Sequence, residues 1–326
     1  MSNTWQPTCS IEFMRLRARM LDDIRHFFSK RDVLEVETPL LSYSSGTDPQ
    51  LDFFTTEYGL PPLQHRLFLQ TSPEFAMKRL LAAGSGSIYQ ICKAFRNGES
   101  GRFHNPEFTM LEWYRVGFTL PQLMDEIAEL IGLLFKGHRT LNATQRFSYQ
   151  ELFHRYTGLD PLVFSYQNYC AYALANHTPE AVSICGYDHA LWLDFIFSHK
   201  VQPQLGENAL CMVYDYPACQ SSLARINADN SLVADRAEVF INGIELGNGY
   251  YELTDATEQD RRFDEEIDIR QQRKRPLTVK DKHLIAALEA GLPDCSGMAI
   301  GLDRLLMLLS DNASIQDVLN FPLHRA

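Results

Sequence analysis

Hydrophobic side chains recur at spacings of three and four over residues 11–30, where the chain shows its first regular pattern. The recurring positions are Phe13, Leu16, Met20, Ile24 and Phe27. This spacing lines one face of a helix with apolar side chains, so an amphipathic helix is predicted. Residues 33–38 are rich in β-branched and apolar side chains and stop at Pro39, which predicts a short strand.

The rest of the chain mixes strand and helix patterns. Thr71 and Ser72, followed by Pro73, place a hydroxyl cap and a proline before an apolar run, which predicts a helix that ends at Gly84. Asn242-Gly243 between two apolar runs predicts a hairpin. Further strands are expected at 67–70, 88–95, 107–114, 237–241 and 244–253, and further helices at 121–135, 257–274, 281–290 and 303–309.

Three segments are not regular elements in this interpretation. Residues 96–106 form a polar connection longer than a usual hairpin loop, which favours a functional role. Residues 297–301, Gly-Met-Ala-Ile-Gly, are interpreted as a glycine-spaced turn, of a kind found where backbone approaches a nucleotide, although short glycine patterns are common. Residues 137–235 give mixed helical and turn signals without a recognisable motif.

Composition places the chain among ordinary globular proteins, with 326 residues of which 45% are hydrophobic. A chain of this length buries roughly 75% of its unfolded surface, so its core needs no disulfide or metal. No apolar run approaches the roughly 18 residues of a membrane span, and the N-terminus lacks a secretory signal pattern. The seven cysteines are scattered without a CxxC pair, which predicts a cytoplasmic location and argues against a zinc site.

The net charge of -11, from 30 basic and 41 acidic residues, gives no overall basic face for nonspecific nucleic-acid binding. The densest basic stretch is residues 270–275, and the favoured interpretation is a solvated helix end. A basic protein partner would still be attracted to an acidic surface.

Carboxylates gather on the predicted strands. Alternation puts Phe108, Met110, Glu112 and Tyr114 on one face, and leaves Thr109, Leu111 and Trp113 for the core. The strand after the Asn-Gly turn gives a similar set: Asn248, Tyr250 and Glu252, with Glu245 earlier. Buried carboxylates are costly unless cations lie beside them. For any single residue, a half-exposed sheet facing water is the favoured alternative.

Two arginines lie next to these strands, Arg96 at the start of the long loop and Arg304 at the start of the last helix. A lone arginine is usually part of a surface ion pair, but two arginines facing carboxylates suit a phosphate-bearing ligand with its own metal ion. The chain has no GxxxxGK[ST], HExxH or GxSxG motif, which excludes P-loop kinases, zincins and α/β-hydrolases.

Five blocks of the chain together resemble the catalytic core of class II lysyl-tRNA synthetases. They are IRHFFSKRDVLEVETPLL (24–41), TSPEFAMKRLL (71–81), FRNGESGRFHNPEFTMLEWY (95–114), IELGNGYYELTD (244–255) and GMAIGLDR (297–304). The resemblance covers about residues 11–320 and is weakest over 115–235. It implies an α+β fold, a mainly antiparallel sheet flanked by helices, in one catalytic domain over residues 1–326.

Such synthetases carry an N-terminal β-barrel that reads the anticodon, and here the catalytic pattern already begins near residue 11. The expectation is therefore a free-standing relative that activates (R)-β-lysine with ATP and attaches it to a lysine of translation elongation factor P, without stable tRNA binding. The alternatives are a truncated synthetase activating α-lysine, an amide-forming enzyme similar to asparagine synthetase, and a non-enzymatic regulatory paralogue. The first-motif helix and strand would form a homodimer interface.

The resemblance also implies roles for single residues. Arg96 would hold the α-phosphate of ATP and Arg304 the γ-phosphate, both as catalytic residues. The other implied ATP contacts are Asn97, Gly98, Glu99, Asn105, Phe108 (stacked on adenine), Glu245, Leu246 and Gly301. Mg²⁺ would be held by Glu238 and Glu245. The implied contacts of the lysine-like substrate are Ser72, Pro73, Glu74, Glu112, Tyr114, Asn248, Tyr250, Glu252 and Ala299.

The chain departs from the family pattern at two places. Gly98 stands where most members have glutamate, with Glu99 one position later, so either Glu99 reaches the adenine amino group or a backbone contact replaces it. Ala299 stands where the tRNA synthetases have glycine. One extra methyl in a binding site changes selectivity by about 1–3 kcal/mol, which would favour a β-amino acid over α-lysine.

Overall fold

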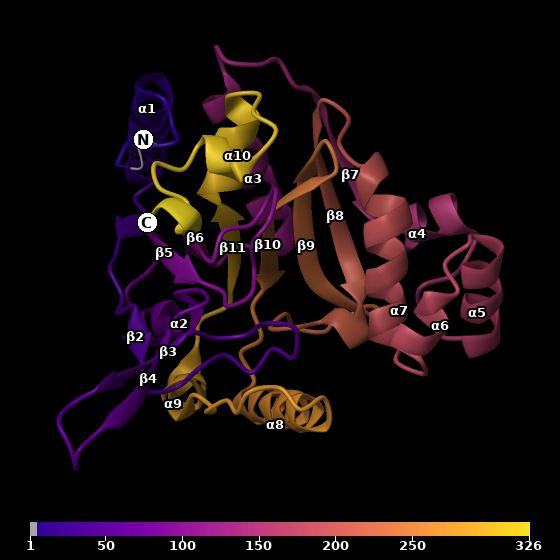
Figure 1. Cartoon of the computed structure of the whole chain (residues 1–326). Helices are drawn as coiled ribbons and strands as arrows, with labels where there is room; N and C mark the ends of the chain where they lie inside the picture. Colours follow the sequence, from indigo (N-terminus) through magenta and orange to yellow (C-terminus); the bar gives the residue numbers. More distant parts are fainter. Residues whose placement is uncertain (1–4) are drawn as a thin grey trace. The chain divides into compact units, whose positions relative to one another are not determined.

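The computed structural model describes residues 5–326. The chain divides into two compact units, each drawn in Figure 1. The first comprises the residues up to Thr119, Leu133–Arg139 and Thr254–Ala326, and the second comprises Leu120–Gly132 and Thr140–Leu253. Helix α3 (Leu120–Phe135) contributes residues to both.

In the first unit, four strands form a sheet in the order β1-β5-β6-β11. Their bounds are β1 (Leu34–Glu35), β5 (Ile88–Phe95), β6 (Glu107–Val116) and β11 (Cys295–Gly301). Only β1 and β5 are parallel; β5–β6 and β6–β11 are antiparallel. The strands predicted at 88–95 and 107–114 are confirmed, whereas the strand expected over 33–38 is only two residues long.

The turn predicted at 297–301 is wrong, because these residues belong to strand β11. The strand pairs with β6 from Cys295, opposite Val116, to Gly301, opposite Met110. Glycine is a poor strand former, but here the ladder supplies main-chain hydrogen bonds along the whole segment. Gly297 lies opposite Tyr114, so a residue without a side chain adjoins a large one.

Helix α1 (Ile11–Ser29) confirms the first predicted helix, and Ser10 caps it by accepting a hydrogen bond from the Phe13 amide at 3.3 Å. Phe28 at its end packs against two residues of the sheet: its ring centroid lies 4.5 Å from that of Tyr89 and 5.5 Å from that of Trp113. Trp113 and Leu111 are fully buried, so the predicted core face of β6 is confirmed.

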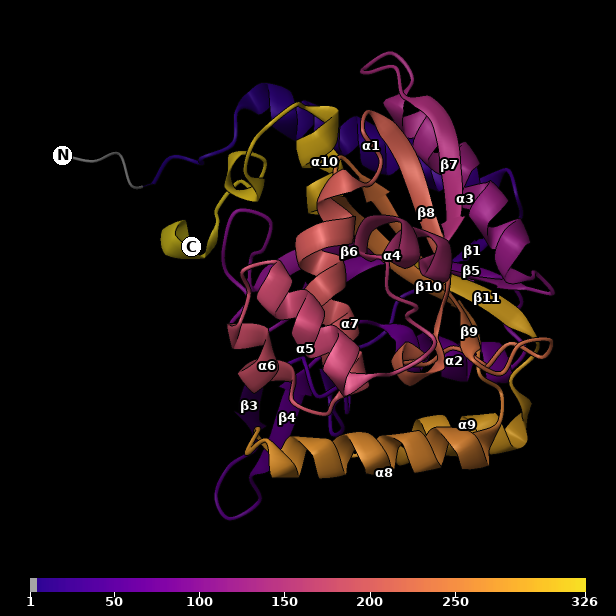
Figure 2. The same ribbon diagram turned by 90° about the vertical axis from the view of Figure 1, so that its right-hand side faces the viewer.

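The first unit also contains a second sheet and several helices. The second sheet has the order β2-β4-β3, and Figure 1 shows its β3–β4 hairpin projecting from the unit. The bounds are β2 (Leu41–Ser42), β3 (Thr55–Tyr58), β4 (His65–Leu69), α2 (Glu74–Ala82), α8 (Ala256–Gln272), α9 (Lys282–Gly291) and α10 (Leu302–Leu309), with short 3₁₀ helices η4 (Ile315–Asp317) and η5 (Leu323–Arg325). Helices α8 and α9 lie side by side in Figure 2.

The interpretation of residues 270–275 as a solvated helix end is wrong for its first residue. Arg270 is 2% exposed. Its Nη1 donates to the carbonyl oxygens of Asp48 at 2.7 Å and Leu51 at 2.6 Å. A guanidinium can be buried where carbonyl acceptors surround it, and these acceptors lie more than 200 residues earlier in the chain, beyond the reach of a local pattern.

In the second unit, four strands follow the order β10-β9-β8-β7. They are β7 (Asn142–Ser148), β8 (Ala209–Pro217), β9 (Val233–Ile241) and β10 (Ile244–Tyr251), and only β7–β8 is parallel. The predicted hairpin is confirmed: the turn residues Asn242 and Gly243 have φ of 51° and 71°, as the favoured two-residue turn requires.

Besides β7 and β8, the segment that gave no readable motif forms several helices. Figure 2 shows four of them grouped: α4 (Tyr149–Thr157), α5 (Tyr166–Ala175), α6 (Glu180–Cys185) and α7 (His189–Ile196). The others are the π-helix η1 (Phe197–Val201) and the 3₁₀ helices η2 (Gln202–Gln204) and η3 (Ala218–Gln220). Their core, with Tyr149, Trp192 and Phe240 fully buried, is an aromatic cluster against the strands. It supports the β8–β9 part of the sheet.

Candidate active site

Glu112 is the most buried carboxylate among the expected substrate residues of the first unit, with 2% of its surface exposed. Its Oε2 accepts a hydrogen bond from the Ser72 hydroxyl and its Oε1 one from the Tyr114 hydroxyl, both at 2.6 Å. These donors hold the carboxylate in one orientation. The water-facing interpretation is therefore wrong for Glu112, and also for Tyr114 and Glu252, which are 2% and 1% exposed.

The strand ladders place Glu112 in a row across the sheet, between Gln90 of β5 and Ala299 of β11. Residues paired in this way point to the same face. On the same face, Cys92 has its pKa raised to about 12 by burial and by the negative charge of Glu112. The thiol therefore stays neutral, and the negative potential on this face suits a cationic ligand.

The start of α2 positions two more of the expected residues. The Ser72 hydroxyl accepts from the Glu74 amide at 3.0 Å, which fixes the turn before the helix. The Glu74 carboxylate lies 2.7 Å from Lys78 Nζ, one helical turn later. Lys78 is 2% exposed, and the sequence interpretation missed it although the i, i+4 spacing was visible. Glu74 thus faces a cation supplied by the chain itself.

Arg96 begins the long loop and lies over the ring of Phe108, 5.1 Å from its centroid. Its Nη1 is 3.9 Å from the Glu99 carboxylate. Gly98 has φ of +82°, a left-handed conformation that a glutamate adopts only with strain. The local backbone therefore accounts for glycine at this position, and the carboxylate of Glu99 is the one that pairs with Arg96.

Arg304 contacts the same loop from helix α10. Its Nε donates to the Phe103 carbonyl at 3.1 Å, and its Nη2 lies 2.7 Å from Nε2 of His104. The sequence interpretation did not single out His104, although it lies inside the HNPEF block. The helix start is fixed by Asp303, which accepts from Arg17 at 2.5 Å and from the Thr109 amide at 2.7 Å.

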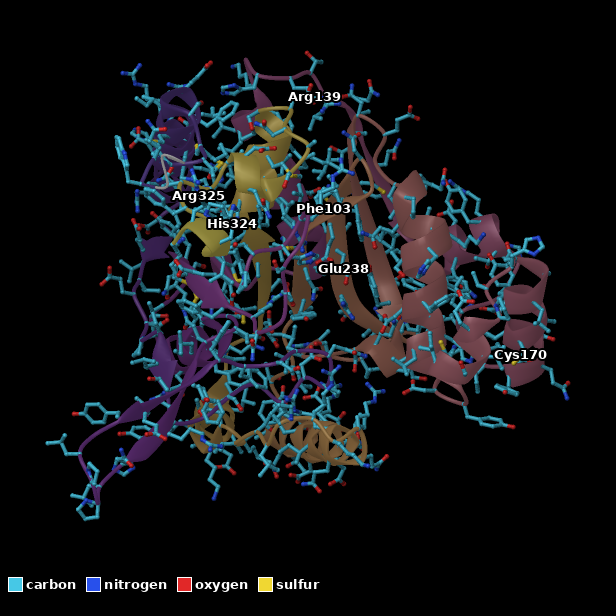
Figure 3. The ribbon with its side chains drawn as sticks, viewed as in Figure 1. Phe103, Arg139, Cys170, Glu238, His324 and Arg325 are labelled. Carbon is cyan, nitrogen blue, oxygen red and sulfur yellow. The ribbon has the colours of Figure 1, made fainter. Side chains whose placement is uncertain are left out.

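In this structure the Asn105 side chain hydrogen-bonds to the main chain at the end of the loop and near the C-terminus. Its Nδ2 donates to the Glu107 carbonyl at 2.6 Å, and its Oδ1 accepts from the Leu323 amide at 3.3 Å. Figure 3 marks Phe103 in the loop and His324 in the C-terminal turn next to Leu323. The backbone of Asn97 is held as well, since its amide donates to the Asp52 carbonyl at 2.9 Å.

In the second unit, a β-bulge decides which face the acidic residues share. The β9–β10 pairing joins Asn248 to Glu238 and Glu245 to Phe240, with the irregularity between Glu245 and Gly247. Glu245 and Asn248 differ in parity, and the extra residue of the bulge brings them to one face. The extra residue is Leu246, and its side chain is buried.

The Glu238 carboxylate accepts hydrogen bonds from two side chains on this face. Arg236 Nη2 donates to Oε1 at 2.5 Å, and the Tyr216 hydroxyl donates to Oε2 at 2.6 Å. Burial raises the pKa of Glu238 to about 7, against the lowering effect of Arg236 and with a further increase from the charge of Glu245. Figure 3 marks Glu238 on β9.

The pair Glu238 and Glu245 fits the demands of Mg²⁺. This ion is usually held by one or two carboxylates and completes its shell with phosphate oxygens and water. Each carboxylate oxygen has two lone pairs, so Glu238 keeps acceptor capacity beside its two donors. Over residues 5–326, no group of three or more His, Cys, Asp or Glu side chains is arranged to hold a metal, so a complete all-protein cage is not seen.

The sequence interpretation missed Arg236. Its guanidinium hydrogen-bonds to Glu238 and Asn248, and Asn248 links it to Tyr250. Beyond Glu238, its Nε donates to Asn248 Oδ1 at 3.1 Å. Asn248 Nδ2 in turn donates to the Tyr250 hydroxyl at 2.7 Å. Glu252, the residue that follows β10, is held through its main chain, because its carbonyl accepts a hydrogen bond from Arg225 Nε at 3.1 Å.

Residues 7–325 match the protein family described as tRNA synthetases class II (D, K and N). The chain belongs to this family. The predicted α+β fold, a mainly antiparallel sheet flanked by helices, is thereby confirmed as the class II synthetase catalytic fold. Membership implies that the protein uses ATP.

The chain is also similar over its whole length to three proteins called elongation factor P--(R)-beta-lysine ligase. The relative from Vibrio atlanticus (strain LGP32) is 46% identical over 328 residues, covering 100% of both chains. The relative from Vibrio parahaemolyticus is 47% identical, covering 99% of both chains, and that from Vibrio cholerae is 46% identical, covering 100% of this chain and 99% of its own.

The expected site residues fall into both units. Those in the first unit are Ser72, Pro73, Glu74, Arg96, Asn97, Gly98, Glu99, Asn105, Phe108, Glu112, Tyr114, Ala299, Gly301 and Arg304. Those in the second unit are Glu238, Glu245, Leu246, Asn248, Tyr250 and Glu252. No helix in the part of the chain that the structure describes has the length and apolar character to cross a membrane.

Proposed function

We propose that this protein is an ATP-dependent ligase that activates (R)-β-lysine as an adenylate and attaches it to a lysine side chain of translation elongation factor P. The observation that carries the proposal is the full-length similarity, at 46–47% identity, to ligases named for this reaction. The buried carboxylate of Glu112 agrees with it, because a fixed anion on a negative sheet face suits an amine of the substrate.

In the first step, the β-lysine carboxylate attacks the α-phosphorus of ATP. A carboxylate oxygen–phosphorus bond forms as the bond to the pyrophosphate oxygen breaks. Arg96 and Arg304 neutralise phosphate charge as it shifts toward the leaving group, and Phe108 supports adenine. The reaction needs no nucleophile from the protein, so positioning and electrostatic stabilisation supply the catalysis.

The metal assignment is part of the proposal. Glu238 and Glu245 would hold Mg²⁺, which would supply charge stabilisation of the phosphate oxygens. The donors from Arg236 and Tyr216 keep the Glu238 carboxylate in place before the nucleotide arrives. Preorganisation of this kind avoids the cost of ordering a ligand during binding.

In the second step, a neutral lysine ε-amine of elongation factor P attacks the acyl carbon of the adenylate. A carbon–nitrogen bond forms, the bond to the AMP oxygen breaks, and the amine loses a proton to water. Glu112 with its two hydroxyl partners, and Glu74 with Lys78, orient the bound β-lysine for this attack.

We place the reaction in the cytoplasm. The cysteines of the chain are free, as is usual for proteins that work in a reducing compartment.

We also propose a homodimer, formed through the first-motif helix and strand, residues 24–41. Three large hydrophobic side chains are exposed in this segment: Leu34, Leu40 and Leu41, of which Leu34 is 56% exposed. An apolar group of this kind usually marks an interface. Sedimentation equilibrium of the wild type and a Leu41→Glu variant tests this: the variant is expected to be a monomer, and a monomeric wild type would refute the dimer.

Two assays test the function. Pyrophosphate exchange is measured with β-lysine, α-lysine and aspartate, and β-lysine is expected to give the fastest exchange. Labelled β-lysine is then supplied with ATP and either elongation factor P or lysine tRNA. Label on the factor alone supports the proposal, whereas label on tRNA at a comparable rate replaces it with a lysyl-tRNA synthetase, an activity that the family description also covers.

A further inference from the structure

Arg270 of α8 is buried against one short segment of the first unit. Its Nη1 donates to the carbonyl oxygens of Asp48 at 2.7 Å and Leu51 at 2.6 Å, and its Nη2 lies 3.4 Å from Oδ1 of Asp52. These acceptors belong to the 48–52 segment, which lies between β2 and β3 in the chain. A guanidinium donates in a rigid planar fork, so Arg270 fixes the place of this segment on α8.

The buried and the exposed arginine of this region differ in what they contact. Arg275 Nη1 lies 2.9 Å from Oδ2 of Asp52, and its side chain is 41% exposed, so it belongs to a surface ion pair of small energy. Arg270 is 2% exposed and donates to main-chain carbonyls, among them that of Pro276 at 3.1 Å. A buried guanidinium that loses its acceptors is costly. The contacts of Arg270, more than those of Arg275, therefore hold the segment.

The 48–52 segment in turn holds the start of the long loop that begins at Arg96. Asp52 and Asn97 form an isolated antiparallel bridge, in which the Asn97 amide donates to the Asp52 carbonyl oxygen at 2.9 Å. The Arg96 amide donates to the Pro106 carbonyl oxygen, also at 2.9 Å, which closes the loop on itself. The main chain at the start of the loop is thus held once within the loop and once by the segment.

The position of the Arg96 guanidinium depends on this attachment. The guanidinium rests on the Phe108 ring and lies 3.9 Å from the Glu99 carboxylate, a distance longer than a hydrogen bond. Its Nε is buried, and no group in residues 5–326 accepts a hydrogen bond from it. The stacking and the ion pair fix the guanidinium less firmly than short hydrogen bonds would, so its position follows that of the main chain.

We propose that Arg270 is a positioning residue for the ATP site. By fixing the 48–52 segment on α8, it sets the place of Asn97 and hence the position from which Arg96 meets the α-phosphate. The inference rests on the proposed function, which assigns this phosphate to Arg96. A catalytic group displaced by about 1 Å can cost on the order of 10²-fold in rate, so a residue two contacts away from Arg96 affects adenylate formation.

Arg270→Lys tests the proposal, because a lysine keeps the charge but its single nitrogen cannot reach the acceptors that the planar fork reaches together. Pyrophosphate exchange gives kcat and the KM values for ATP and β-lysine, each measured with the other substrate saturating. The KM for ATP is expected to rise about 10- to 100-fold, as for a weakened hydrogen bond to a charged group, and the KM for β-lysine to stay within about twofold.

The matched control is Arg261→Lys, because Arg261 lies on the same helix, is 53% exposed and pairs with Glu258 at 2.8 Å. It is expected to leave both KM values within about twofold of wild type. Urea unfolding midpoints are measured for both variants. A purely structural role of Arg270 would lower the midpoint and kcat and leave the KM for ATP unchanged, and this result would overturn the proposal. An equal rise in both KM values would overturn it as well.

Hydrogen exchange tests the connection between Arg270 and the loop without substrate. The Asn97 amide is protected by its bond to the Asp52 carbonyl oxygen, so peptides that contain residue 97 should exchange faster in Arg270→Lys than in wild type or Arg261→Lys. Peptides of α1 should exchange alike in all three proteins. Unchanged exchange at residue 97 would show that Arg270 does not hold the loop.

Should Arg270→Lys not fold, Asp52→Asn takes its place. The Asp52 side chain is 26% exposed, and the substitution removes the charge that attracts both arginines but keeps the shape of the residue. The KM for ATP is expected to rise about 2- to 5-fold, the range for a partly exposed ion pair, and an unchanged KM would overturn the proposal. A wild type that gives no exchange with β-lysine would refute the proposed function. A normal wild type with an unaffected Arg270→Lys variant would refute this inference alone.

Discussion

Ala299 lies directly opposite Glu112 in the antiparallel ladder of β11 and β6. The Cβ atoms of such a pair are about 4.5–5.5 Å apart, so the methyl group adjoins the carboxylate that Ser72 and Tyr114 hold in place. In the proposed substrate site, a small residue there would control how closely the substrate amine and its carbon chain approach Glu112. Glycine at this position would open space of about one methyl group.

We therefore predict that Ala299→Gly shifts selectivity toward α-lysine. The ratio of kcat/KM for β-lysine to that for α-lysine in pyrophosphate exchange should fall by about 5- to 100-fold, the range for one methyl group in a binding site. Ala290→Gly, at an exposed position of α9, is the control for a glycine substitution elsewhere. An unchanged ratio would show that Ala299 does not select the substrate.

Arg96→Ala is predicted to lower adenylate formation by about 10²- to 10³-fold, the cost of one preorganised transition-state donor. The side chain is partly exposed and rests on Phe108, so the unfolding midpoint should change little. Pyrophosphate exchange measures the first effect and urea unfolding the second. Arg15→Ala, an exposed arginine of α1, is the control, and exchange at the wild-type rate in Arg96→Ala would remove the phosphate assignment.

Glu245→Gln is predicted to raise the Mg²⁺ and ATP concentrations needed for half-maximal exchange, while β-lysine binding stays nearly intact. The amide lacks the charge that Mg²⁺ prefers in a ligand. Titrations of Mg²⁺, ATP and β-lysine by calorimetry distinguish these effects. If β-lysine binding were lost and ATP binding retained, Glu245 would belong to the amino-acid contacts instead.

Periodicity predicted the sheet well because it is a property of neighbouring residues. The period of two placed Trp113 and Leu111 in the core and Glu112 on the other face, as the ladder confirms. The burial of Glu112 was beyond the pattern, since Ser72 approaches from 40 residues away. Arg270 was misjudged for the same reason: its acceptors belong to a distant loop.

In the candidate site, too, the sequence indicated some features and only the structure gave others. Its residues came from the family resemblance, and the role of each stays a prediction, as does the single catalytic domain. Only the structure showed which side chains these residues contact. Lys78 lies beside Glu74, His104 beside Arg304, and Arg236 between Glu238 and Asn248. Arg236 sits two residues before Glu238 and pairs across a hairpin with a bulge, so its contacts depend on a register that the sequence does not reveal.

Glu266 on α8 gives a pH-dependent prediction. Burial raises its pKa to about 7, the hydrogen bond from the Thr47 hydroxyl opposes the increase, and the negative charges of Asp48 and Glu74 add to it. Because the pKa in the folded protein exceeds that of an exposed carboxyl, the unfolded chain releases this proton more readily. Ionised Glu266 therefore lowers the free energy of unfolding. The contribution of Glu266 to stability falls as pH rises from about 4.5 to about 7.

Glu266→Gln removes the charge and keeps an oxygen that accepts from Thr47. The variant should be more stable than wild type by about 1–2 kcal/mol at pH 8, after allowance for the partial exposure of the side chain, and nearly equal at pH 5. Urea unfolding at both pH values measures the difference. Glu265→Gln is the neighbouring control, because Glu265 is exposed and pairs with Arg261, so its substitution should give no gain at pH 8. If Glu266→Gln increased the free energy of unfolding equally at both pH values, packing and not ionisation would explain the effect.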